Sequence, residues 1–157
     1  MSLEELREQN IRLVTEKALE CFIKNGINNT RVSEIAAESG LTQRSVFRYF
    51  PSKDDIVIAA AFCYWERTKA YIARELRCHT DDAQTGIEQI NIILNSYANI
   101  LFVDPEGIRF SLDAEVALYS VGKNAHVINR PPERYEAYKG PLSQAVRRGL
   151  ADGTVDP

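Results

Sequence analysis

Cysteine is scarce in this sequence of 157 residues, which holds three. Cys21, Cys63 and Cys78 make an odd number without paired spacing, which argues against a disulfide-stapled secreted domain. The expected compartment is therefore a reducing cytoplasm. Long apolar runs are also missing: none approaches the roughly 20 residues that span a bilayer, and the N-terminus lacks the apolar segment of a signal peptide. The sequence predicts no membrane partner.

Strand signals and an overall excess of positive charge are missing too. Helical spacing recurs along the chain instead, and 45% hydrophobic content can form a core, so we expect an all-α fold. The net charge of −3 excludes a general basic coat for nucleic acid. Between residues 43 and 53, however, every charged side chain is basic: Arg44, Arg48 and Lys53. Such a local patch can dock on phosphate while the acidic remainder stays away from it.

The chain also lacks the residue patterns of catalytic and metal sites. We find no nucleophile with a nearby base in a recognisable context, no glycine-rich phosphate loop and no metal-ligand cluster. Cys78 and His79 are adjacent, without the intervening residues that let a pair close on zinc, and His126 is isolated. Cys63 lies on an apolar helix, where a core role is expected. The sequence predicts neither an enzyme nor a metal or other cofactor.

Apolar spacing and capping residues outline a series of helices. We expect the first over about residues 10–25, stopped by Gly26, and a helix-turn-helix from Thr30. A long helix should begin after Pro51 and end near Arg77. The next is apolar on two faces and should be surrounded on most sides. The remaining expectations are a helix that opens at Asp104-Pro105, a loop over residues 122–132, and a last helix from about 133, kinked at Gly140-Pro141 and ending near Gly149.

The helix pair that follows Thr30 has a physical reason at each key position. Ala36 is small enough for two helices to cross closely, and Gly40 can adopt the left-handed backbone that the turn requires. Thr42 can cap the second helix. Val46 should close a small core with Ile35 and Leu41, which leaves the side chains of Gln43, Arg44, Ser45 and Arg48 facing outward.

These spacings resemble those of TetR-type transcriptional regulators over about residues 11–60. The matching residues are Ala18, Phe22, Gly26, Thr30, Ile35-Ala36, Gly40-Leu41-Thr42, Val46 and Arg48-Tyr49-Phe50-Pro51-Ser52-Lys53. The resemblance implies a DNA-binding head of three helices at residues 1–51, joined by a long helix to a helical regulatory body at residues 52–157. Arg148-Gly149 and Asp152-Gly153 match a turn that the family often shows.

The family's roles carry over to matching positions in this chain. Thr30 and Arg31 are expected to touch phosphate. Thr42, Gln43, Arg44 and Ser45 would lie at the start of a recognition helix in the major groove, with Arg44 the best candidate for reading a guanine edge. The expected DNA-binding residues are Thr30, Arg31, Thr42, Gln43, Arg44, Ser45, Phe47, Arg48, Tyr49 and Lys53, of which Tyr49 and Lys53 would grip the backbone.

Three features depart from the family pattern. Phe47 stands where such regulators usually carry tyrosine, so one phosphate hydrogen bond is lost or passed to Tyr49. Arg31 replaces a frequent threonine and adds a compensating charge. The chain stops at Pro157, before the helices that usually pair two subunits, so we expect either a longer natural protein, which we favour, or a different way of dimerising.

The resemblance implies a ligand-responsive transcriptional regulator. We expect a homodimer that binds double-stranded operator DNA of near-palindromic sequence, a repressor rather than an activator, released by an unknown small-molecule inducer. Tyr64, Asn95 and Tyr97 are candidate ligand-binding residues, although their spacing fits core packing equally well. The alternative is a binding module of the same fold that senses a small molecule or a protein without binding DNA.

Overall fold

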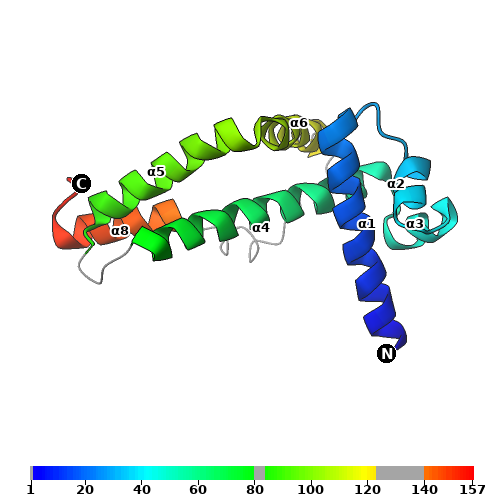
Figure 1. The fold of residues 1–157 in the computed structure, drawn as a ribbon, viewed down its shortest axis with the longest axis horizontal. Coiled ribbons are helices and arrows are strands. Elements are labelled where there is room, and N and C mark those ends of the chain that lie inside the picture. The colour runs from blue at the N-terminus through cyan, green and yellow to red at the C-terminus, as the bar shows by residue number, and fades with distance from the viewer. Residues whose placement is uncertain (1, 80–83, 123–139) are drawn as a thin grey trace. The chain divides into compact units, whose positions relative to one another are not determined.

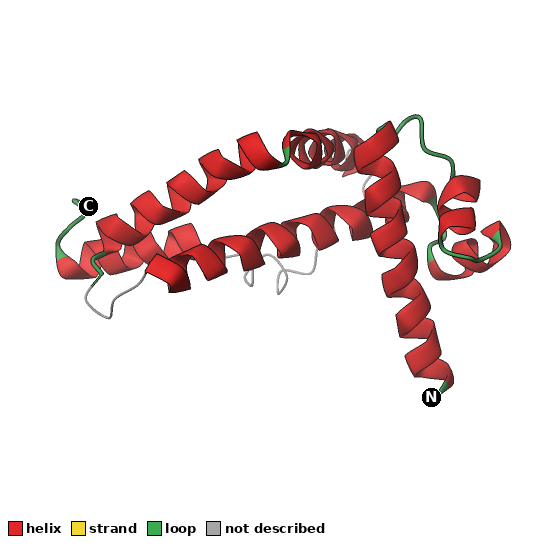
Figure 2. Cartoon of the chain, in the orientation of Figure 1, coloured by secondary structure: helices red, strands yellow, loops and turns green. Residues whose placement is uncertain are grey.

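The computed structural model describes residues 2–79, 84–122 and 140–157, and within these ranges it contains helices and no strand (Figures 1 and 2). The helices are α1 (Leu3–Asn25), α2 (Val32–Glu38), α3 (Gln43–Tyr49), α4 (Lys53–His79), α5 (Gly86–Val103), α6 (Pro105–Gly122) and α8 (Pro141–Asp152). The predicted all-α class is confirmed. The predicted loop at 122–132, the start of the last predicted helix and His126 lie almost wholly outside the described residues.

The chain divides into two compact units. The head unit comprises residues 1–65 and 106–124, and the body unit comprises residues 66–105 and 125–157. This division differs from the predicted one after residue 51, because the first half of α4 and most of α6 pack with α1, α2 and α3. Phe110 and Ala114 of α6 are fully buried in the same apolar core as Phe22 of α1 and Ile56 of α4.

Helix α1 begins earlier than predicted. It starts at Leu3, about two turns before residue 10, because Ser2 and Glu5 form a reciprocal cap. The Glu5 backbone N–H donates to Ser2 Oγ at 3.1 Å, and the Ser2 N–H donates to Glu5 Oε2 at 2.6 Å. Gly26 ends the helix as predicted, with φ of +83° and its N–H donated to the carbonyl of Phe22.

Aromatic rings join α6 to the rest of the head unit. The rings of Phe22 and Phe110 stack with centroids 5.9 Å apart, and Tyr64 meets Phe110 edge-on at 6.2 Å. Trp65 adds a polar contact, since its Nε1–H donates to Ser111 Oγ at 3.1 Å. Burying two phenylalanines in this way stabilises the head by several kcal/mol, on the order of 2 kcal/mol for each ring.

The body unit is held by a close crossing of α5 and α8. A Cβ atom added at Gly86 would lie 2.0 Å from the backbone nitrogen of Gly149, so only glycine fits there. The Gly86 N–H donates to Asp152 Oδ2 at 2.7 Å, and the Ile87 N–H donates to Thr154 Oγ1 at 3.2 Å. Hydrogen bonds from Thr154 and from Gly86 hold the pKa of Asp152 below its usual value.

The last helix differs from its prediction. Gly140 is the N-cap of α8 in an extended conformation, and Pro141 is its first residue, so this pair starts a helix rather than kinking one. Helix α8 continues past Gly149 to Asp152, and Gly153 follows with φ of +74°. The prediction of a stop at Gly149 was wrong because this glycine serves the crossing with Gly86 instead of ending the helix.

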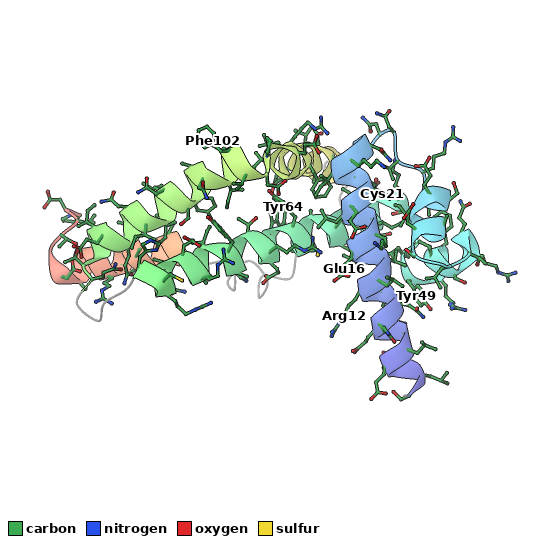
Figure 3. All side chains as sticks on the ribbon, in the orientation of Figure 1. Arg12, Glu16, Cys21, Tyr49, Tyr64 and Phe102 are labelled. Carbon is green, nitrogen blue, oxygen red and sulfur yellow. The ribbon has the colours of Figure 1, made fainter. Side chains whose placement is uncertain are left out.

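The prediction that the apolar helix is surrounded on most sides is also wrong. Only one side of α5 is buried, through Ile93, Ser96 and Ile100, which step by three and four residues. Other large side chains of the helix are exposed, among them Leu94 at 51%, Leu101 at 55% and Phe102 at 84%. Figure 3 shows Phe102 standing away from the ribbon. In the described residues no helix is long and apolar enough to cross a membrane.

Candidate nucleic-acid interface

The turn between α2 and α3 forms as its sequence predicts. Gly40 has φ of +65°, a conformation that residues with a Cβ rarely adopt. Its N–H donates to the carbonyl of Ala37, and the Leu41 N–H donates to that of Ala36, which closes the turn. Val46 and Ile35 are fully buried beneath it. The helix pair is therefore fixed by packing on its inner side, and the outer side of α3 stays open.

Four neighbouring side chains form the outer side of α3. Gln43, Arg44, Phe47 and Arg48 are all exposed, and they repeat at the four-residue spacing that places side chains on one helix face. We call them the α3 stripe. Val46 and Phe50 on the opposite side are buried. The stripe combines two guanidinium groups, an amide and an aromatic ring that is 39% exposed, so it can offer both hydrogen-bond donors and apolar contact.

Two hydroxyl groups stand at the start of α3. Thr42 Oγ1 accepts the backbone N–H of Ser45 at 3.1 Å, which confirms the predicted cap. The hydroxyls of Thr42 and Ser45 also lie 3.0 Å apart and share one hydrogen bond. That bond uses one of their two protons, so the other remains for an outside acceptor. Thr42 is exposed and Ser45 is half-buried.

Tyr49 is held by two donors. Asn10 Nδ2 donates to its phenolic oxygen at 3.2 Å, and Arg48 Nη2 donates at 3.0 Å while the guanidinium lies over the ring, 5.1 Å from its centroid. Figure 3 places Tyr49 beside α1. The hydrogen bond from Arg48, with a smaller contribution from Asn10, lowers the pKa of Tyr49. Two accepted bonds fill the oxygen's lone pairs, which leaves its O–H free to donate.

Asn10 is a residue that the sequence analysis missed as part of this site. It comes from α1, separated from Tyr49 by 39 positions in the sequence, so no local spacing marks it. The only available signal was an amide at the edge of the predicted first helix, and a polar residue there is ordinarily solvated. Its contact depends on how α1 crosses α3, which local patterns do not specify.

Thr30 does not fit its predicted phosphate contact. Its side chain is 1% exposed. The hydroxyl donates to the carbonyl of Gly26 at 2.8 Å and lies 3.2 Å from that of Cys21. The Cys21 carbonyl belongs to the last part of α1, and Gly26 follows the end of that helix. Thr30 therefore ties the start of the helix-turn-helix to α1, and we leave it out of the candidate interface.

Arg31 and Lys53 stand at the starts of two other helices of the head unit. Arg31 is exposed at the N-cap of α2, and its backbone N–H donates to Glu34 at 3.1 Å. Lys53 is half-buried at the first position of α4. At the start of α4, Ser52 Oγ accepts the N–H of Asp55 at 3.2 Å, and Asp54 and Asp55 place negative charge in the first turn. Lys53 can therefore act mainly through its own ammonium group.

The three candidate ligand residues belong to two units. Tyr64 is 6% exposed and belongs to the core of the head unit. Asn95 and Tyr97 are exposed on α5 of the body unit. Asn95 and Tyr97 stand two positions apart and so point to different faces of α5. A ligand cavity made by these residues remains a prediction.

The described residues hold no group of three histidine, cysteine or acidic side chains that could bind a metal ion. Cys78 and His79 are exposed at the end of α4, where the His79 ring nitrogen Nδ1 lies 2.8 Å from the carbonyl of Glu75. Cys63 packs partly buried against the head core, as predicted. Burial raises the pKa of the Cys21 thiol, which disfavours its reactive thiolate.

Residues 14–60 match the family model of the bacterial regulatory proteins of the tetR family. YuxN, an uncharacterized HTH-type transcriptional regulator of Bacillus subtilis strain 168, is 31% identical over 57% of this chain and 30% of its own length. A fatty acid metabolism regulator protein of the same organism is 24% identical over 58% of this chain and 45% of its own. The chain thus spans less than half the length of these curated relatives.

A solved structure extends the likeness beyond the head. The transcriptional regulator FadR from Bacillus subtilis, in complex with stearoyl-CoA, superposes over 93% of this chain and 74% of its own with a TM-score of 0.58. The two sequences are 18% identical, so this likeness concerns the fold. Residues 14–60, which contain the helix-turn-helix, therefore match the tetR family of bacterial regulatory proteins, and the chain has a fold similar to that of FadR.

Proposed function

We propose that this protein is a cytoplasmic transcriptional regulator that binds double-stranded operator DNA as a homodimer. The observation that carries the proposal is the α3 stripe, a set of exposed side chains on a helix whose opposite side is locked in the head core. In a helix-turn-helix protein the second helix enters the major groove. A rigidly packed α3 with polar and basic side chains outward has the chemistry that this placement requires.

Each member of the stripe has a distinct role in the proposal. Arg44, at the second position of α3, can bond the O6 and N7 atoms of a guanine with its planar guanidinium. Gln43 can bond an adenine edge in the same two-point way. Phe47 has no hydroxyl to offer phosphate, and its exposed ring suits contact with a thymine methyl group. The stripe would then read the base sequence. Arg31, Tyr49 and Lys53, which we call its flanks, would bind the phosphate backbone.

Tyr49 takes the phosphate contact that Phe47 cannot make. The supporting geometry is the pair of bonds from Asn10 and Arg48, which orient the phenol and leave its proton for an outside acceptor. Arg31 and Lys53 add positive charge at the starts of α2 and α4. Contacts of this kind fix register and affinity, and they make binding strongly dependent on salt.

Dimerisation and ligand response complete the proposal. Two heads that read successive half-sites must lie about 34–36 Å apart or at a multiple of that distance. A ligand in the helical body that changed this separation would weaken DNA binding, and DNA would weaken ligand binding by the same factor. The stearoyl-CoA complex of FadR supports a ligand-binding role for this fold. We propose a repressor released by a small-molecule inducer.

A second candidate is a head that contacts a protein partner instead of DNA. The exposed ring of Phe47 and the net charge of −3 favour it. The two candidates differ in salt dependence, because neutralised phosphates release counterions whereas an apolar protein contact does not.

Selection of bound duplexes from a random-sequence pool tests the proposal, followed by affinity measurements over a salt series. We expect an inverted repeat to be enriched and its affinity to fall steeply as salt rises. Enrichment of an inverted repeat would also give the operator and imply two heads. A folded, dimeric sample of the natural protein that enriches no sequence would overturn the proposal and favour the second candidate.

A further inference from the structure

A cleft of about 480 Å³ lies in the head unit between the end of α1, the turn after it and α6. Figure 1 shows α6 beside the C-terminal end of α1. The volume of the cleft lies in the range of small-molecule sites. Asn25, Asn28 and Asn29 line the side of the turn, and Arg109, Asp113 and Val116 line the side of α6. Neither the α3 stripe nor its flanks contribute to this cleft.

The two charged residues of the cleft are not paired with each other. Arg109 and Asp113 stand four positions apart on α6, a spacing at which opposite charges commonly meet. The ion pairs found in the described part of the chain join other residues. Arg109 instead directs Nη2 to the carbonyl of Ile23 at 3.2 Å, near the end of α1. A guanidinium has five N–H donors, so this contact leaves most of them available.

The negative side of the cleft has two sources. Asp113 contributes an exposed carboxylate, and α1 ends at Asn25 with its carbonyl groups directed toward the turn. A helix C-terminus carries partial negative charge because its last carbonyls lack helical partners. The Asn25 carbonyl already accepts a hydrogen bond from Asn29 Nδ2 at 3.0 Å, which holds the turn in shape. The cleft therefore combines one positive group with a negative region, and Ile27 and Val116 add apolar side chains to its lining.

We propose that this cleft binds a small zwitterion of the α-amino acid class. The free N–H groups of Arg109 would hold the carboxylate, and Asp113 with the asparagine amide oxygens would hold the ammonium group. The side chain of the ligand would rest on Ile27 and Val116. Because the ligand would bridge α6 and the end of α1, it would stiffen the junction that carries Phe22 and Phe110. The proposal does not depend on DNA binding.

Calorimetric titration of the whole chain with the common α-amino acids tests the proposal. Each amino acid that binds is compared with its N-acetyl form, which lacks the ammonium, and its amide, which lacks the carboxylate. We expect both derivatives to bind at least tenfold more weakly. Arg109→Gln should weaken the parent amino acid about tenfold, and Asp113→Asn should do the same, since each removes a charge-assisted hydrogen bond.

Glu115→Gln is the matched control, because Glu115 is exposed on α6 and does not line the cleft. It should leave binding unchanged, and circular dichroism should show that all three variants fold, since the three substituted side chains are exposed. The proposal is overturned if no α-amino acid binds at about 10 mM, a concentration that would reveal even millimolar affinity. Binding that Asp113→Asn leaves intact, or that the N-acetyl form retains, would also overturn it.

Discussion

The head unit and the body unit are each stabilised internally by a different kind of contact. In the head, side chains from five helices fill one core, and the ring of Phe110 contacts those of Phe22 and Tyr64. In the body, α5 and α8 meet through glycine backbones and polar caps, and α5 leaves large apolar side chains exposed. The head therefore holds the α3 stripe on a packed support, whereas the body combines a smaller buried set, Ile72, Ile93 and Ile100, with close backbone contacts.

This difference explains why the packing of the head unit could be predicted from the sequence and that of the body unit could not. The head core follows apolar spacing, so the buried positions of Ile35, Ala36 and Val46 could be predicted from that spacing alone. The body crossing depends on Gly86 and Gly149, whose role appears only when two distant helices approach. Apolar spacing on α5 predicted burial on most sides, and the structure buries one side, because spacing shows which residues are apolar and not what covers them.

The largest expected contrast comes from truncating a large apolar side chain in each unit. Phe22→Ala should lower the free energy of unfolding by about 4 kcal/mol, because it removes a fully buried ring stacked on Phe110. Leu101→Ala, at a position 55% exposed on α5, should cost less than about 1 kcal/mol. Urea unfolding of both variants measures the contrast. Equal losses would show that α5 is covered in solution as fully as the head core.

Replacing one glycine of each unit by alanine tests the difference between head and body further. Gly86→Ala should destabilise the body by about 3 kcal/mol, since the new Cβ would overlap the backbone of Gly149. Gly40→Ala in the head meets open space and should cost only about 1 kcal/mol, from its positive φ. Thermal unfolding gives both values. A Gly86→Ala protein as stable as Gly40→Ala would contradict the close crossing of α5 and α8.

The smallest effect concerns the phenol of Tyr49. Tyr49→Phe should weaken binding to the selected operator about fivefold at neutral pH, the value of one hydrogen bond. In the parent protein, affinity should also fall as pH rises through the lowered pKa of Tyr49, because tyrosinate cannot donate and repels phosphate. The fall should begin below the ordinary tyrosine pKa of about 10. Fluorescence anisotropy at several pH values measures both effects.

The Tyr49→Phe variant is its own control for pH, since it lacks the titrating phenol and should lose the earlier part of the fall. Asn10→Ala provides a second check, because it removes one of the two donors that orient the phenol. If Tyr49→Phe binds as tightly as the parent and shows the same pH profile, Tyr49 does not contact phosphate.

The candidate interface was predictable where one helix determines it. The cap at Thr42, the turn at Gly40 and the outward positions of Gln43 and Arg44 follow from local rules and from the family resemblance. Errors arose where a distant segment decides the outcome. Thr30 faces inward, where its hydroxyl bonds carbonyls of Cys21 and Gly26. Asn10 joins Tyr49 because α1 crosses α3. The earlier start of α1 has a local cause instead, the cap that Ser2 and Glu5 form.

The central claim is that the α3 stripe reads bases and its flanks grip phosphate. The most direct test measures the affinities of Arg44→Ala and Lys53→Ala for the selected operator and for each of its single-base variants. We predict that Arg44→Ala loses about 1–3 kcal/mol on the operator and no longer distinguishes the base pair that it reads. Lys53→Ala should weaken all sequences alike and reduce the salt slope by about one contact. Two variants with the same profile across all sequences would contradict the account.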